Sequence, residues 1–253
     1  MLRAYGEGKV FGEAYGDGPV QVLWLHGWAR TGADFAASAS ELAREGISSV
    51  ALDLPGFGSS PLPAAAGGGE AYARLLAPVL SDLGEGPFIL VGHSFGGRVA
   101  PFLAVEHPEK VTALVLTGAP LVRVGGVHRS PPGYRLVRAL HRRGLLSEAR
   151  MEAARQKYGS RDYRDAAGLL REIMVASVTE DYEHVLSLIS VPVALVWGAE
   201  DPDISPEVAR RIAQLLTRSP DVRLEVLADT GHLVPRERPA ALSAQVRRLV
   251  QTP

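Results

Sequence analysis

The sequence predicts an α/β fold with a mostly parallel sheet covered by helices on both faces. Two observations predict this fold and its domain organisation. Short aliphatic runs, typical of strands buried on both faces, alternate along the chain with longer segments of helical patterning. One stretch of helical character, between residues 121 and 185, interrupts that alternation. In a chain of 253 residues this pattern favours one large domain with a helical insertion.

The predicted strands are nearly continuous hydrophobic runs bounded by glycine, proline or acidic residues. They begin at Val20, Ile47, Phe88, Lys110, Val191 and Val222. The segments between and after them have helical patterning and are predicted to be helices at 33–46, 69–84, 95–109, 205–220 and 238–251.

The insertion shows helical patterns at 134–146, 147–159 and 166–178 and no convincing buried strand. We therefore expect a core domain from residues 1–120 and 186–253, with a helical cap from 121–185. The cap has 12 basic against 8 acidic residues, a net charge of +4. Six arginines precede its first acid, Glu148: Arg123, Arg129, Arg135, Arg138, Arg142 and Arg143. They indicate either a solvated helix surface or a lid that favours substrates with a carboxylate or phosphate.

Composition limits the classes of partner. The chain has 46% hydrophobic residues, 22% charged residues and a net charge of -1, which gives no global reason to expect nucleic acid or an anionic membrane. It has no cysteine, which excludes disulfides and thiolate chemistry. The first residues carry glycines and charges, and no run approaches the roughly 18 apolar residues of a membrane span. We expect a cytoplasmic protein.

The segment "FILVGHSFGGRVA", residues 88–100, carries the main chemical signal. Gly92 and Gly96 flank Ser94 in the pattern G-x-S-x-G, after a predicted strand and before a predicted helix. In such a sharp turn the neighbours two positions away must be small. The turn presents the hydroxyl at the carboxyl end of the strand, where helix N–H groups can stabilise an oxyanion. Ser94 is the candidate nucleophile.

A serine nucleophile needs a base and a carboxylate that holds the base in one tautomer. His232 follows the last predicted strand and Asp201 follows the strand before it, so both are expected at the same edge of the sheet as Ser94. Sequence spacing leaves four candidates for the carboxylate: Asp201, Glu200, Asp203 and Asp229.

An oxyanion hole requires two backbone donors directed at one point. The N–H of Phe95, directly after the nucleophile, is one candidate. The other is the N–H of Trp28, in the loop "LHGW" after the first long strand, where Gly27 permits a tight turn. The side chain of Trp28 is also expected to form a wall of the acyl pocket.

The motifs "LHGW", "DLPGFGSS", "GHSFGG", "VWGAEDP" and "GHLVPRERP", in this order, resemble the α/β-hydrolase superfamily over nearly all of the chain outside the insertion. The resemblance implies an eight-stranded, mostly parallel sheet with a helical cap after the sixth strand. It also implies a triad of Ser94, Asp201 and His232. The layout is similar to small microbial carboxylesterases, including the pimeloyl-ester esterase type. That type has tryptophan where this chain has His93, so its specific activity does not carry over.

The expected function is hydrolysis of carboxylic esters of small to medium acyl groups, without a cofactor, on a small-molecule substrate. One alternative is a C–C bond hydrolase, lyase or perhydrolase that uses the same triad on an anionic substrate. Another is a non-catalytic binding or receptor protein on the same scaffold. The expected substrate-binding residues are Trp28, Phe95, Leu121, Met174 and Val234.

No metal site is expected, because the seven histidines show neither H-x-x-x-H nor H-x-H spacing. The chain also lacks a G-x-G-x-x-G motif and a P-loop lysine. His93 adjoins Ser94, but consecutive residues of the turn point apart, so a neutral packing or hydrogen-bonding role is expected. The sequence leaves the oligomeric state open.

Overall fold

The computed structural model describes residues 1–124, 131–158 and 161–251. Its sheet has eight strands in the order β1-β2-β4-β3-β5-β6-β7-β8. The first two pairings, β1 with β2 and β2 with β4, are antiparallel, and all the others are parallel. The strands are β1 (Leu2–Tyr5), β2 (Val10–Tyr15), β3 (Val20–Leu25), β4 (Ser48–Asp53), β5 (Phe88–His93), β6 (Val111–Thr117), β7 (Val193–Gly198) and β8 (Val222–Leu227). The predicted fold class is confirmed.

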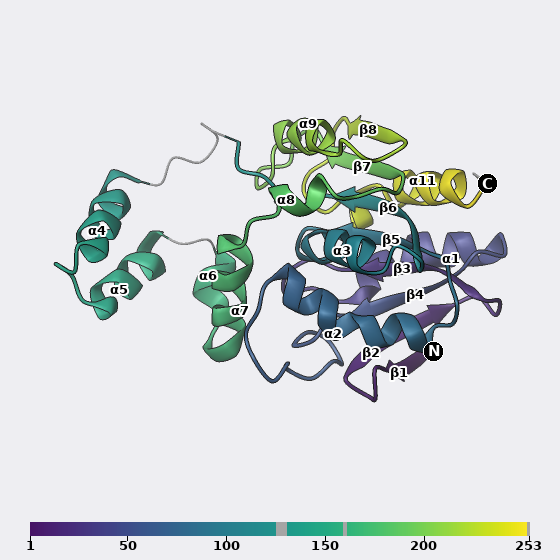
Figure 1. The fold of residues 1–253 in the computed structure, drawn as a ribbon, viewed down its shortest axis with the longest axis horizontal. Coiled ribbons are helices and arrows are strands. Elements are labelled where there is room, and N and C mark those ends of the chain that lie inside the picture. The colour runs from purple at the N-terminus through teal and green to yellow at the C-terminus, as the bar shows by residue number, and fades with distance from the viewer. Residues whose placement is uncertain (125–130, 159–160, 252–253) are drawn as a thin grey trace.

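Helices cover the sheet on both faces, as Figure 1 shows. One hydrophobic core packs α1 (Ala36–Arg44) and α11 (Pro239–Gln251) against the sheet. The core on the other face packs α2 (Gly69–Asp82), α3 (Phe95–Glu106) and α9 (Pro206–Leu215). The short elements are the 3-10 helix η1 (Gly32–Phe35), α8 (Glu183–Leu186) and α10 (Val234–Glu237). The central strands β4 to β7 are almost fully buried, as their hydrophobic runs predict.

Two details differ from the expectation drawn from the hydrophobic runs. The N-terminal residues form β1 and β2, which are partly exposed and carry no continuous apolar run. Strand β8 is mostly exposed, although its sequence is rich in valine and leucine. Both differences have one cause: β1 and β8 are the edge strands of the sheet, so neighbouring elements cover them less completely.

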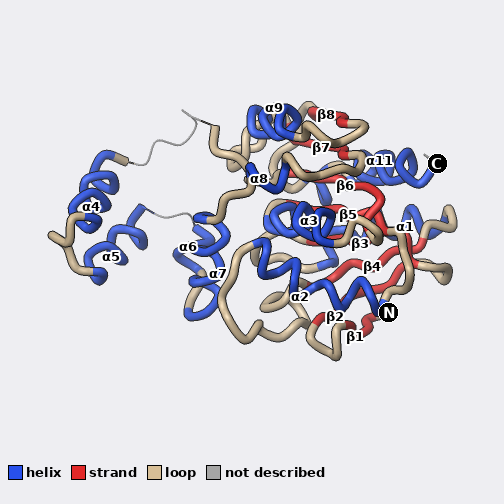
Figure 2. Tube along the Cα trace, in the orientation of Figure 1, coloured by secondary structure: helices blue, strands red, loops and turns tan. Residues whose placement is uncertain are grey.

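The described residues between β6 and β7 form helices joined by loops, as the tube in Figure 2 shows. The described helices of this segment are α4 (Pro132–Arg142), α5 (Glu148–Tyr158), α6 (Arg161–Asp165), α7 (Gly168–Thr179) and the short α8. The hairpin of α4 and α5 lies farther from the sheet than α6 and α7 (Figure 1). Arg129 lies outside the described residues.

The carboxylate of Glu180 joins this segment to the core. It accepts backbone N–H groups from Gly69 at 2.6 Å and Glu70 at 3.3 Å, at the start of α2. A negative charge at the positive end of a helix dipole stabilises the contact. Within the described ranges, no helix is long and apolar enough to span a membrane.

Candidate active site

Ser94 occupies a strained turn between β5 and α3. Its backbone has φ 48° and ψ −104°, in the left-handed half of φ where residues with a Cβ are disfavoured. The Ser94 N–H donates to the Thr117 carbonyl oxygen at the end of β6, with an N···O distance of 2.9 Å. The strained residue is thereby fixed to the neighbouring strand.

The glycines around Ser94 are required by close backbone approach. A Cβ added at Gly92 would lie 2.7 Å from the Gly96 carbonyl oxygen, and one added at Gly96 would overlap the Leu25 carbonyl on β3. A Cβ added at Gly97 would lie 2.5 Å from the Cβ of Ala119. Real Cβ atoms do not tolerate such distances, so the turn excludes larger residues at these positions. The spacing of the motif is therefore explained by the packing of β3, β5 and α3.

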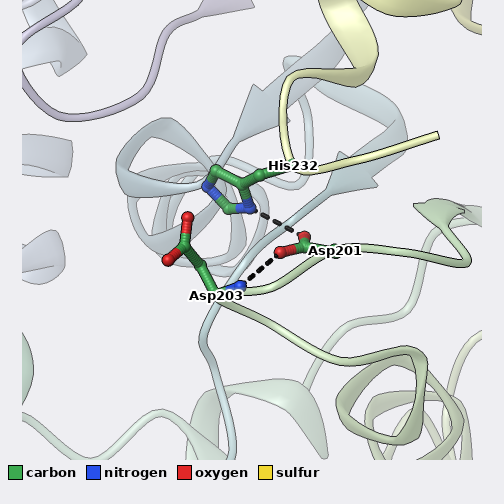
Figure 3. Close-up of side chains that lie close together, drawn as sticks. All are labelled: Asp201, Asp203 and His232. Carbon is green, nitrogen blue, oxygen red and sulfur yellow. Dashed lines mark hydrogen bonds and ion pairs between the residues drawn. The ribbon is translucent and has the colours of Figure 1, made fainter.

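Asp201 and His232 form a hydrogen-bonded pair at the carboxyl ends of β7 and β8. The Asp201 Oδ2 atom lies 2.7 Å from His232 Nδ1, as Figure 3 shows. The other oxygen, Oδ1, accepts the backbone N–H groups of Asp203 at 2.9 Å and Ile204 at 2.8 Å. These bonds place the imidazole proton on Nδ1 and leave the lone pair of Nε2 available to act as a base. Of the four carboxylates left open by spacing, Asp201 is the one that bonds His232.

Ser94 and His232 lie at the same edge of the sheet. Among the described residues, the Ser94 hydroxyl forms no hydrogen bond with the His232 ring. Both lie against the end of β6. Ser94 bonds Thr117, and a Cβ added at the next residue, Gly118, would lie 2.8 Å from His232 Cε1. In unliganded hydrolases the serine–histidine bond is often long and shortens when substrate binds. The arrangement is compatible with that behaviour.

The pKa of His232 lies above its ordinary value of 6.5. Burial acts to lower the pKa, but the hydrogen bond and charge of Asp201 outweigh it, and the charges of Asp203 and Asp162 act in the same direction. The protonated ring is thus stabilised by its surroundings. A base of this kind holds an abstracted proton readily.

Two further residues hold the loop that carries His232. The carboxylate of Glu237 accepts the N–H of Gly231 at 2.6 Å and the N–H of Leu233 at 3.0 Å. The fully buried ring of His93 donates from Nε2 to the His232 carbonyl oxygen at 3.0 Å. Burial lowers the pKa of His93 to about 3, so the ring stays neutral beside the base. The neutral ring agrees with the role expected for His93, whereas Glu237 was not among the residues predicted from the sequence.

The loop after β3 is held by His26. Its Nε2 accepts the Leu54 N–H at 2.9 Å, so the proton lies on Nδ1 and donates to the Gly27 carbonyl at 2.6 Å. Burial lowers the pKa of His26 to about 4, which keeps this tautomer neutral. Within the described residues, the N–H groups of Trp28 and Phe95 donate to no protein acceptor. They are the two groups expected to form the oxyanion hole.

Aromatic rings gather beside this loop. The ring centroid of Trp28 lies 5.0 Å from that of Phe57 and 5.4 Å from that of Phe95, in edge-to-face geometry. Phe57 comes from the "DLPGFG" loop after β4 and was missed as a candidate pocket residue. Its position next to Trp28 follows from the pairing of β3 with β4.

The other expected pocket residues are buried. Leu121 is 2% exposed, Met174 7% and Val234 1%. Val234 packs in the core beneath α1 and α11. Leu121 lines a cavity of about 290 Å³ between α3 and residues 177–183, and neither Ser94 nor His232 lines that cavity. Their contact with substrate stays a prediction.

Three potential metal-ligating side chains also lie close together at this site. Asp201, Asp203 and His232 each place one potential ligand atom within 4.8 Å of the others. Both oxygens of Asp201 already have hydrogen-bond partners, one on the imidazole and one on the backbone. The grouping is therefore explained by the Asp201–His232 pair and its neighbouring acid.

The strained serine turn and the histidine–carboxylate pair lie at one edge of a parallel sheet. This arrangement is typical of a hydrolase-type site. The family model described as "alpha/beta hydrolase fold" matches residues 21–239, and the chain belongs to this family.

Related proteins agree with this assignment. The chain is 33% identical to lipase LipV of Mycobacterium tuberculosis, over 93% of this chain and 95% of that protein. It is 30% identical to a 2-hydroxy-6-oxononadienedioate/2-hydroxy-6-oxononatrienedioate hydrolase of Burkholderia vietnamiensis, over 86% and 82% of the two chains. The esterase of Exiguobacterium antarcticum has a similar fold, with a TM-score of 0.74, 23% identity and coverage of 100% and 99%. The protein is a hydrolase of the α/β-hydrolase family.

Proposed function

We propose that this protein is a serine hydrolase that cleaves carboxylic esters of small to medium acyl groups. The observation that supports it most directly is the Asp201–His232 hydrogen bond of 2.7 Å at the sheet edge where the strained turn presents Ser94. A serine in such a turn, with a base whose tautomer is fixed, is the equipment that acyl transfer requires.

In the proposed reaction the Ser94 oxygen attacks the ester carbonyl carbon while His232 Nε2 takes the hydroxyl proton. Asp201 stabilises the resulting imidazolium through Nδ1–H. The N–H groups of Trp28 and Phe95 stabilise the oxyanion. The carbon–oxygen bond to the alcohol then breaks, and His232 returns the proton to the leaving alcohol. Water, activated by the same histidine, releases the acid from Ser94.

The walls of the acyl site are proposed to be the aromatic side chains beside the oxyanion loop, the loop of residues 26–31 after β3. The rings of Trp28, Phe57 and Phe95 contact one another, and Trp28 is the partly exposed member of this cluster. An acyl chain held there would bury apolar area at about 25 cal/mol per Å². Longer chains should therefore bind more tightly until the chain outgrows the aromatic surface.

The second candidate is a hydrolase of anionic, carboxylate-bearing substrates with the same triad. The similarity to the Burkholderia hydrolase, whose named substrates are dicarboxylates, favours it. Cations near the bound carboxylate would strengthen the binding of such a substrate. The charges of Asp203 and Asp162 near His232 favour the neutral ester instead.

The test is hydrolysis of 4-nitrophenyl esters from acetate to decanoate by wild type and by Ser94→Ala, with circular dichroism to show that both are folded. The proposal expects an optimum at short to medium chain length and loss of turnover in the variant. A fluorophosphonate should also label Ser94 in the wild type, as intact-mass analysis would show. Hydrolysis by folded Ser94→Ala, or no hydrolysis of any ester by wild type, would overturn the proposal.

A further inference from the structure

A second carboxylate lies beside the base without holding it. Asp203 is exposed on the loop between β7 and α9, and its carboxylate is turned toward the His232 ring (Figure 3). One oxygen each of Asp203 and Asp201 and one ring nitrogen of His232 lie within 4.8 Å of one another. The mechanism proposed above assigns no step to Asp203.

The two carboxylates are neutralised to different degrees. Asp201 is buried, and its oxygens bond the His232 ring and two backbone N–H groups. The carboxylate of Asp203 has no hydrogen bond or ion pair with any described residue; its backbone N–H only donates to Asp201. The charge of Asp203 therefore acts outward, on solvent and on whatever binds beside His232.

Three arginines of the oxyanion loop and the cap are paired with carboxylates. Arg30, in the oxyanion loop, donates to both oxygens of Asp34, at 2.6 and 2.5 Å. In the cap, Arg155 pairs with Glu148 and Glu152, and Arg171 pairs with Glu152. A neighbouring carboxylate therefore offsets each of these three positive charges.

Three further cap arginines lie far from the base. Arg135, Arg138 and Arg142 are exposed on α4, in the hairpin that lies beyond α6 and α7 from the sheet (Figure 1). The charged groups that act most strongly on His232 are Asp201, Asp203 and, from α6, Asp162. His93, the other titratable ring packed on His232, is neutral. The carboxylates of Asp201, Asp203 and Asp162 therefore contribute a negative potential at the base.

We propose that Asp203 sets the preference of this hydrolase for the charge of its substrate, so that the site selects cationic and neutral esters over anionic ones. This inference rests on the ester-hydrolase function proposed above. Two unit charges about 7 Å apart, partly screened by water, interact strongly enough to change kcat/KM by about three- to tenfold. Salt at 0.5 M should remove most of the effect, because the Debye length falls from about 8 Å at physiological ionic strength toward about 3 Å at 1 M.

The test uses three 4-nitrophenyl esters of matched acyl length that differ in the terminal group: methyl, carboxylate or trimethylammonium. The leaving group and the reacting bond are the same in all three. Rates are measured on the alkaline plateau of the wild-type pH–rate profile, at low and at high ionic strength. Wild type should show the order cationic, neutral, anionic, with steps of about three- to tenfold that shrink in 0.5 M salt.

Asp203→Asn keeps the shape of the side chain and removes its charge. It should reduce each step to less than about twofold while the neutral ester is still hydrolysed. Glu200→Gln, on the same exposed loop, is the matched control and should leave the charge preference unchanged.

The outcomes separate the two proposals. Hydrolysis of the neutral ester with equal charge ratios in wild type and Asp203→Asn would overturn the role of Asp203 and leave the esterase function standing. A wild-type preference for the anionic ester would also overturn it. Failure of wild type to hydrolyse any of the three esters would overturn both.

Discussion

The carboxylate of Glu237 brackets His232 by accepting the backbone N–H groups of the residues on either side of it, Gly231 at 2.6 Å and Leu233 at 3.0 Å. The side chain of His232 therefore projects from a backbone segment that is fixed at both ends. The Asp201 bond orients the imidazole ring itself, and His93 holds the His232 carbonyl. The base is positioned by three groups, from the end of β5, the loop after β7 and helix α10.

Glu237→Gln should lower kcat by about ten- to a hundredfold with little change in KM. The glutamine keeps one acceptor oxygen but presents an NH₂ group to one of the two N–H donors, so the loop must shift. A displacement of about 1 Å at a catalytic group can cost on the order of a hundredfold in rate. Steady-state kinetics on the best 4-nitrophenyl ester would measure the effect.

Glu207→Gln is the control, because Glu207 is exposed and pairs with Arg210 on α9, away from the site. A variant at Glu237 that unfolds more easily but keeps wild-type kcat would show that Glu237 stabilises the fold without positioning His232.

The acidic limb of the pH–rate profile should have its midpoint above pH 6.5. His232 acts as a base only when it is neutral, and its surroundings raise the pKa above 6.5. Activity should therefore fall as the pH falls through that raised pKa. Asp203→Asn removes one of the stabilising charges and should move the limb toward lower pH. Measuring kcat/KM from pH 5 to 9 tests this, and a wild-type midpoint at or below 6.5 would contradict it.

The sequence predicted the elements that carry the site because their signals are local. The buried strands β3 to β7 have aliphatic runs, and the serine turn has glycines where backbones touch. Strands β1 and β2 lack such runs because they pair antiparallel at the exposed edge of the sheet. Their presence was expected only from the resemblance to a family.

Tertiary contacts decided what the sequence left open. Four acids near His232 were equivalent by spacing, and the geometry of the loop after β7 makes Asp201 the one that reaches the ring. The role of Glu237 depends on the turn into α10, which folds the side chain back on residues 231 and 233. Such a return contact leaves no pattern in a single sequence.

Ser94→Gly should be more stable than Ser94→Ala by about 1 kcal/mol, and both should be inactive. The φ of 48° at Ser94 strains any residue with a Cβ, so alanine keeps the strain and glycine releases it. The greater chain entropy of unfolded glycine offsets part of the gain. Urea unfolding of the two variants measures the difference. Equal stability, or a more stable alanine variant, would show that the turn carries no strain worth releasing.

His93→Gln should make the protein less sensitive to acid. The pKa of His93 is lowered from 6.5 to about 3 by burial, so the unfolded chain binds a proton that the folded chain does not. Stability linked to His93 is therefore fully present above pH 6.5 and declines as the pH falls toward 3. At pH 5 that loss is about 2 kcal/mol.

Glutamine does not titrate, and its amide can still donate to the His232 carbonyl. Between pH 7 and pH 5 the variant should lose about 2 kcal/mol less free energy of unfolding than wild type, whatever its stability at pH 7. His184→Gln, at an exposed position, should keep the wild-type dependence. Parallel pH dependences for wild type and His93→Gln would mean that the folded protein accommodates a proton on this ring, so that His93 would no longer be a neutral support for His232.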